Sequence, residues 1–202
     1  MAVQSGVYRG VSAEERAAER RTRLLEATLA VWADPEVSTT MTNVCGRAGL
    51  SERYFYESFA NLDAALTAVL DEVATEIETT THQAAEDAGT EPAARAVASV
   101  SAFVQLLVDD PRKGRVAIVE AAAMPALRPR RTELMRHFAH RTAEAAGELD
   151  LAPRSGAEDE LAGLLFIGGV AELVTAWLDG AVDATPDELV AIAARSFLGL
   201  YH

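Results

Sequence analysis

The sequence is poor in cysteine and in aromatic residues. Its one cysteine among 202 residues, Cys45, excludes a disulfide within the chain and a zinc site made of several cysteines. This composition fits a reducing compartment, and we expect a cytoplasmic protein. Aromatic residues make up only 6% of the chain, whereas Ala and Leu are abundant. Because Ala and Leu favour helices, and β-branched and aromatic residues favour strands, the sequence predicts an all-α fold.

The N-terminal region has no apolar run long enough for a signal peptide, so none is expected. The longest apolar stretch of the chain, residues 161–178, approaches the length of a membrane span. It contains Glu172 and lies between acidic segments, which is unfavourable in a bilayer. We interpret it as a buried helix and expect no membrane association.

Basic residues are few. The 18 Lys and Arg against 31 Asp and Glu give a net charge of −13, which is unusual for a protein that binds nucleic acid. The charge is unevenly distributed: residues 1–60 hold seven Arg and eight Asp or Glu, whereas the remainder holds 11 Lys and Arg and 23 Asp and Glu. Only the N-terminal part, with a net charge of −1 against −12 for the rest, is therefore expected to approach an anionic partner such as DNA.

Apolar spacing, capping residues and Pro or Gly breaks predict about nine helices. Residues 1–11 lack this periodicity and are expected to form a mobile arm. We predict a helix-turn-helix domain over residues 12–61 and a larger helical domain over 62–202. The first three helices are expected at 12–34, 40–48 and 52–59. A fourth begins at 61 and ends at the break near 89, and a fifth follows that break and ends near 110. The remaining helices are expected at 112–123, 129–149, 157–178 and from 186 onward. The last of them has the apolar stripe Leu189, Ile192, Ala193, Phe197 and Leu200.

Local signals fix several helix ends. Ser12 and Glu15 form a capping box, and Gly49 can adopt the positive φ that ends a helix. Ser or Thr and Asn are favoured at the N-cap, where a side-chain oxygen accepts from the first turn. Three further N-caps follow: Thr40, Ser51 and Asn61.

Residues 40–59, TMTNVCGRAGLSERYFYESF, have the spacing of two helices packed across a tight turn. Val44, Ala48, Leu50 and Phe55 would point inward. Cys45 lies where the two helices come closest and is expected to act as a small hydrophobic residue. The segment is therefore predicted to be a helix-turn-helix.

The second helix of this segment is predicted to enter the major groove of DNA. Arg53 can bond a guanine edge or a phosphate, and the tyrosine hydroxyls are expected to donate to phosphate. Thr40 and Thr42, at the positive end of the preceding helix, are expected to contact the DNA backbone. The predicted DNA-binding residues are Thr40, Thr42, Ser51, Glu52, Arg53, Tyr54 and Tyr56, with Glu57 on the same outward face.

Residues 12–70 resemble the DNA-binding domain of the TetR family of regulators. The resemblance is clearest in the run AGLSERYFYESFANLDAAL, residues 48–66. It implies that Tyr56 contacts phosphate and that Arg53 and Tyr54 lie on the recognition face. The sequence departs from the family at Leu62, where many members have a lysine that binds phosphate. Two consequences are open: weaker DNA binding, or replacement of that contact by arginines of the arm.

The resemblance also implies a function: a homodimeric repressor that a small-molecule effector releases from its DNA operator. Helices five to seven would surround the effector, and helices eight and nine would pair with their copies. Effector binding would shift the fourth helix and change the distance between the two recognition helices, which requires different effector affinities in the two states.

The candidate effector-binding residues are Phe103, Leu107, Val119, Met124, Phe138 and Trp177. For the dimer interface, segment 161–178 is apolar on nearly every face, which one helix layer cannot bury. Gly163, Gly168, Gly169 and Ala171 would permit a close helix approach. The predicted interface comprises Leu161, Leu165, Gly168, Gly169, Glu172 and Phe197.

Two alternatives remain open. Glu133, His137, His140 and Glu144 fall on one helix face, with residue types that could bind a divalent metal in a metal sensor or a metal-dependent enzyme. Arginines are interleaved with them, which favours a solvated surface, so we expect no metal and no cofactor. No motif for a catalytic nucleophile or general base is visible, and no enzyme is expected. The other alternative is a helical module whose corner binds protein.

Overall fold

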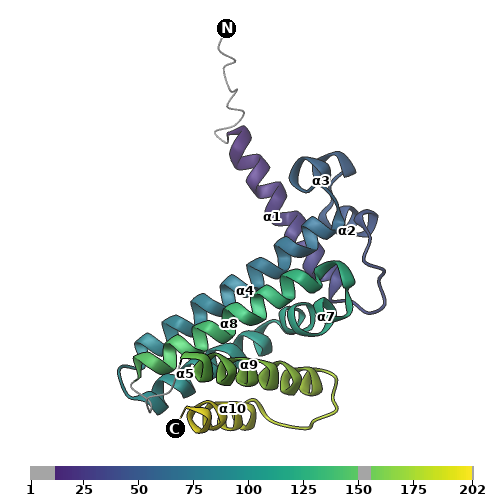
Figure 1. Ribbon diagram of the computed structural model, residues 1–202. Helices are drawn as coiled ribbons and strands as arrows, with labels where there is room; N and C mark the ends of the chain where they lie inside the picture. Colours follow the sequence, from purple (N-terminus) through teal and green to yellow (C-terminus); the bar gives the residue numbers. More distant parts are fainter. Residues whose placement is uncertain (1–11, 150–155, 202) are drawn as a thin grey trace. The chain divides into compact units, whose positions relative to one another are not determined.

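The computed structural model describes residues 12–149 and 156–201, which are helical and contain no strand (Figure 1). Contacts divide the chain into two compact units, residues 1–70 and 71–202, and the boundary falls within α4 (Leu62–Asp87). The domain limits predicted from the sequence assign α4 to the second domain and remain a prediction. The predicted N-terminal arm, residues 1–11, lies outside the described residues.

The first unit contains α1 (Ala13–Trp32), α2 (Met41–Ala48), α3 (Glu52–Ser58) and the beginning of α4. Both α2 and α3 contact α1 (Figure 1). Large apolar side chains fill the space between them, and Leu24, Val44 and Phe55 are fully buried. Burying each such side chain contributes about 1.5–3 kcal/mol, so this small unit has a dense core of its own.

Most predicted helix ends are confirmed. Ser12 and Glu15 form the capping box, the Asn43 backbone N–H donates to Thr40 Oγ1 (3.2 Å), and Gly49 ends α2 with a φ of 62°. Asn61 Oδ1 accepts from the Ala64 backbone N–H (2.8 Å). The prediction for Ser51 was wrong in one respect: Ser51 occupies the N-cap of α3, but its side chain makes no capping hydrogen bond.

The second unit continues from α4 through α5 (Pro92–Asp109) and a composite helical segment. This segment consists of α6 (Pro111–Gly114), the π-helix η1 (Arg115–Glu120) and α7 (Ala121–Ala123). A 3₁₀ turn η2 (Pro125–Leu127) leads into α8 (Arg128–Glu148), followed by α9 (Gly156–Leu178) and α10 (Pro186–Leu200). With the composite segment taken as one helix, the described residues form the nine helices predicted.

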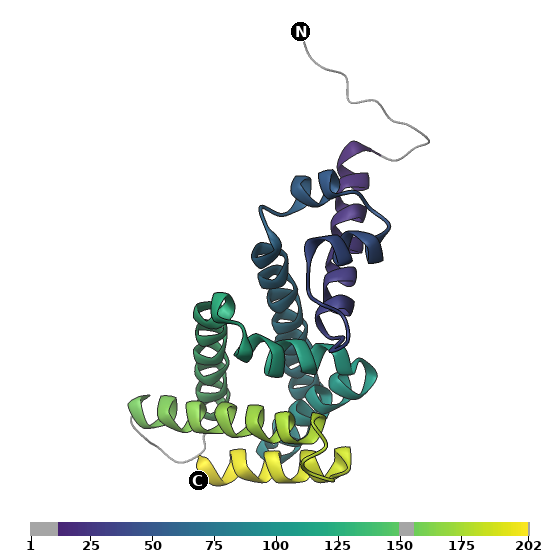
Figure 2. The ribbon, with the colours of Figure 1, turned by 90° about the vertical axis from the view of Figure 1, so that its right-hand side faces the viewer.

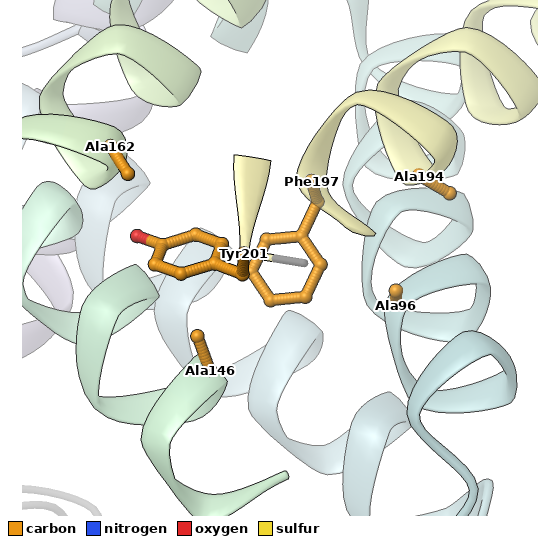
Figure 3. Packing of buried hydrophobic residues seen from close by; sticks show 6 residues of the cluster. All are labelled: Ala96, Ala146, Ala162, Ala194, Phe197 and Tyr201. Carbon is orange, nitrogen blue, oxygen red and sulfur yellow. The ribbon is translucent and has the colours of Figure 1, made fainter. Parts of the chain in front are cut away.

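The C-terminal helix closes the second unit against α5, α8 and α9. Figures 1 and 2 show α9 and α10 side by side, and α10 also packs along α5. Figure 3 shows Phe197 and Tyr201 among small residues of four helices: Ala96, Ala146, Ala162 and Ala194. The Tyr201 hydroxyl donates to the Asp159 carbonyl (3.1 Å), which anchors the end of the chain to the start of α9.

The predicted stripe of α10 needs one correction. Leu189, Ala193 and Phe197 are buried as predicted, but Ile192 is 41% exposed and Ala194 is buried. The inward face is turned by about one residue relative to the prediction, because α10 packs against two helices, α5 and α9.

Candidate nucleic-acid interface

Helix α3 has one face fixed to the core and one face exposed. Phe55 is fully buried, and its ring lies 5.6 Å from that of Phe59, centroid to centroid. On the opposite side the Arg53 side chain is 85% exposed, Tyr54 is 37% exposed and Tyr56 is 58% exposed. The buried aromatic pair thus fixes one face of α3 to the core and leaves the arginine and tyrosine groups exposed to a partner.

A charged cluster positions this exposed face. Arg53 Nε donates to Glu57 Oε1 (3.1 Å), and Glu57 also pairs with Arg20 of α1 (3.7 Å). The Arg20 guanidinium lies 4.6 Å from the centroid of the Tyr54 ring, a cation–π contact. Sequence reasoning missed Arg20, although its place four residues before buried Leu24 puts it on the side of α1 that faces the core.

Helix α2 presents its N-terminus and is held at its C-terminus. Thr40, Thr42 and Ser51 are exposed, as is Glu52 at the start of α3. Arg23 of α1 donates from Nη2 to the Ala48 carbonyl (2.6 Å), an acceptor at the end of α2 that lies beyond the hydrogen-bond pattern of the helix itself. The interaction fixes α2 against α1, and sequence reasoning did not assign it to Arg23.

Cys45 is 5% exposed. Burial, followed by the nearby charge of Glu52, raises the pKa of its thiol and keeps it neutral. These properties agree with the predicted role as a small hydrophobic residue between helices.

The candidate effector residues of the second unit are only partly brought together. Leu107 is fully buried in a cluster with Leu106 and Val174, and Phe103 and Trp177 pack against that cluster. Trp177 Nε1 donates to the Ala184 carbonyl (3.0 Å). The other three candidates are half-buried on different elements: Val119 on η1, Met124 before η2 and Phe138 on α8.

Helix α9 carries an exposed apolar stripe within the single chain. Leu161 is 66% exposed, Leu165 64% and Leu164 43%, although Leu164 was not predicted. One face of α9 continues the stripe with further exposed residues: Gly168, Gly169 and Glu172. By length and composition α9 is the one helix of the described residues that could cross a membrane, with only 17% of its apolar window buried. The expectation of a mostly buried helix therefore does not hold for the single chain.

Two predicted roles around α9 need correction. Phe197 is 7% exposed and lies in the core of its own chain, so it offers little surface to a second copy. Gly163 is buried against α8 of the same chain, where an added Cβ would overlap the Ala139 carbonyl oxygen. The close approach predicted between subunits at Gly163 occurs within one subunit.

The residues of the candidate metal site, Glu133, His137, His140 and Glu144, each form a contact with an oppositely charged or titratable side chain. Glu133 pairs with Arg130 (3.0 Å), and Glu144 pairs with Arg141 (2.6 Å). His137 contacts Glu78 (3.0 Å). Among the described residues no group of three or more His, Cys, Asp or Glu is arranged to hold a metal ion.

His140 links α8 to the start of α9. Its Nδ1 contacts a Glu160 carboxylate oxygen and its Nε2 a Glu144 oxygen (3.3 Å). The hydrogen bond to Glu160 and the charge of Glu144 raise the pKa of His140. Since the charged imidazole is favoured, this link weakens as pH rises through the raised pKa.

Solved structures share this fold over nearly the whole chain. FadR from Bacillus halodurans, a fatty acid degradation regulator, is 18% identical, with a TM-score of 0.75 over 89% of this chain and 95% of its own. A putative TetR-family regulator from Rhodococcus sp. is 19% identical, with a TM-score of 0.74 over 92% of this chain and 100% of its own. FadR from Bacillus subtilis in complex with stearoyl-CoA is 19% identical, with a TM-score of 0.69 over 89% and 97%. No family model matches the sequence, and neither does any curated protein.

The first unit and the comparisons together define the class of structure. The chain consists of an N-terminal helix-turn-helix unit followed by a larger all-helical unit. More specifically, the chain has the fold of the TetR-like transcriptional regulators.

Proposed function

We propose that this protein binds double-stranded DNA through α3. The observation that carries the proposal is the exposed face of Arg53, Tyr54 and Tyr56, held by the buried ring of Phe55. Arg53 supplies bidentate donors for a guanine edge or a phosphate, and the tyrosine hydroxyls supply phosphate donors. Thr40 and Thr42 add donors at the exposed N-terminus of α2, where the helix dipole favours an anion.

The distribution of charge supports this docking direction. The near-neutral N-terminal segment carries the exposed face, while residues 61–202 carry most of the negative charge. Phosphates repel the acidic part and leave the α2–α3 face as the surface that can approach. Leu62, half-buried at the start of α4, has no charge to offer a phosphate.

A gel-shift or fluorescence-anisotropy titration with DNA from upstream of the protein's own gene tests the proposal. Arg53→Ala is expected to weaken binding about 5- to 150-fold, since one good arginine contact is worth about 1–3 kcal/mol. Tyr56→Phe, which removes only a hydroxyl, is expected to have a smaller effect that is similar on all sequences. The matched control is Arg136→Ala, an exposed arginine of the second unit. Equal affinities for the native chain and Arg53→Ala would contradict the proposal.

The proposed regulator is a homodimer whose subunits pair through the exposed stripe of α9. Leu161, Leu164 and Leu165 are too exposed for a soluble single chain to leave uncovered together. Buried Val174 and Gly163 tie another face of α9 into its own chain, which favours a partner subunit over a lipid bilayer. Dimers of this kind present two recognition helices to two operator half-sites.

We further propose that a small molecule bound in the second unit releases the protein from DNA, making it a cytoplasmic repressor. The complex of Bacillus subtilis FadR with stearoyl-CoA shows that one protein of this fold binds an acyl-CoA. In the present chain α4 contributes residues to both units and is the element through which binding would change the spacing of the recognition helices. The metal-sensor alternative has no support, because its carboxylates are paired with arginines.

A further inference from the structure

One half-buried arginine of the second unit has a buried donor atom without an acceptor. The Arg131 Nε atom is buried and has no hydrogen-bond acceptor, the only such side-chain atom found in the described part of the chain. Burying a donor without an acceptor is costly, and it is costlier for a charged group. An unsatisfied group of this kind in a folded protein requires an explanation.

Arg131 lies on the inward face of α8. Phe138 and Thr142 follow it at seven and eleven residues, two and three helical turns, and both are half-buried. This face lies between two anchored sides of α8. On one side Arg130 pairs with Asp71 of α4 (2.7 Å), and on the other Ala139 packs against Gly163 of α9. Arg131 is itself half-buried and lies on α8 between the side that pairs with α4 and the side that packs on α9.

The acidic residues that pair with neighbouring positions of α8 have partners other than Arg131. Asp71 and Glu133 both pair with Arg130, and Glu78 pairs with His137 and Arg141. Large apolar side chains share this face of α8, all of them half-buried: Leu134, Met135 and Phe138. A half-buried cation without a paired acid, on a helix face that also carries apolar side chains, matches a ligand that has a negative group and an apolar body.

We infer that Arg131 binds the anionic group of an amphipathic organic anion, such as a carboxylate or a phosphate ester attached to an apolar body. The inference rests on the proposed effector-binding role of the second unit and adds the chemical class of the effector. The guanidinium donates two parallel hydrogen bonds to such a group, and Phe138 contacts the apolar body. A neutral molecule of the same shape leaves the guanidinium unpaired and binds more weakly.

A matched pair of fluorescent dyes tests the inference and does not require the effector itself. The anionic dye 8-anilinonaphthalene-1-sulfonate and its neutral counterpart N-phenyl-1-naphthylamine share one ring system. The native chain is expected to bind both. Arg131→Met should weaken binding of the sulfonate about ten- to hundredfold and change that of the neutral dye less than about twofold. Arg136→Met, at an exposed position of the same helix, serves as the control.

Competition against the anionic dye separates the possible sources of the negative group. Decanoate and decyl phosphate should displace the dye, decanol should not, and the stronger of the two anions identifies the preferred head group. Loss of both dyes together in Arg131→Met, unchanged sulfonate affinity, or no sulfonate binding by the native chain would overturn the inference. DNA binding by the native chain is measured separately, so failure here is distinguishable from failure of the proposed function.

Discussion

Gly163 sets how closely α8 and α9 approach each other. The Ala139 carbonyl of α8 occupies the position that a Cβ at residue 163 would take. A side chain there must push two helix backbones apart, since no flexible side-chain end is available to move. The contact between α8 and α9 therefore depends on the absence of one methyl group.

We predict that Gly163→Ala destabilises the protein by about 1–3 kcal/mol, the usual cost of overpacking a core. Chemical denaturation followed by circular dichroism measures the change. Gly147→Ala, at a helical glycine with open space around it, is the matched control. It should be neutral or stabilise by up to about 1 kcal/mol through helix propensity. Equal stabilities of the two variants would show that α8 and α9 can separate without cost.

The roles of individual residues were the least predictable feature. Small residues at Gly163, Gly168 and Gly169 indicated a close helix contact, but the sequence did not show which glycine faces α8 and which faces outward. Arg20 was given no role, and Arg131 was interpreted as part of a solvated surface. Both depend on their surroundings in the fold: Arg20 lies beside Tyr54 and Glu57, and Arg131 Nε has no acceptor. Arg53 and Tyr56 were placed correctly on the exposed face because the spacing around Phe55 is local.

At the scale of single helices, capping differs between the two helices of the helix-turn-helix. Thr40 Oγ1 accepts a hydrogen bond from the first turn of α2, whereas the Ser51 side chain makes none at α3. At α3 only the Ser51 carbonyl takes part, accepting from the backbone N–H groups of Tyr54 and Phe55. The two residues look equivalent in the sequence but are not equivalent in the fold.

We predict that Thr40→Ala lowers the free energy of unfolding by about 1 kcal/mol, the typical value of an N-cap hydrogen bond. Ser51→Ala should change it by less than about 0.5 kcal/mol, because no side-chain hydrogen bond is lost. Thermal or denaturant unfolding without DNA measures both variants. A loss at Ser51 as large as that at Thr40 would indicate that its hydroxyl caps α3 in solution.

Helix boundaries were largely predictable because their signals are local. The Gly49 turn, the capping residues and the prolines at 92 and 111 each act within one turn of the chain. The π-helix η1 was not predicted. The wider turn of a π-helix places residues that are five apart above one another. Arg115 Nε donates a hydrogen bond to Glu120 Oε1 (3.0 Å), and Arg115 also forms an ion pair with Asp179 (3.6 Å). Such a turn depends on packing against α9 rather than on local sequence.

At the scale of the whole molecule, two features support the proposed DNA-binding homodimer: the uneven distribution of charge and the exposed apolar stripe of α9. The N-terminal segment is free of strong negative charge, and the stripe offers an apolar surface to a second copy. The stripe follows the 3.6-residue period of α9, so it forms one continuous surface rather than isolated side chains.

We predict that Leu165→Glu converts the proposed dimer into single chains at micromolar concentration. A buried carboxylate in each half of a two-fold interface is unfavourable, and the two copies also repel each other. Light scattering coupled to gel filtration measures the mass. Val97→Glu, at a valine of α5 that is 45% exposed, is the control and should keep the native mass. A dimer that survives Leu165→Glu would show that the subunits associate elsewhere.

The exposed stripe of α9 also has a consequence for newly synthesised chains. Before it dimerises, each chain would expose α9, a helix that is long and apolar enough to cross a membrane. Such exposed apolar surface would make the unpaired chain prone to aggregation. Dimerisation would cover this surface and would stabilise the folded chain. The melting temperature would therefore rise with protein concentration. In such a dimer the level of expression would become part of what keeps the protein folded.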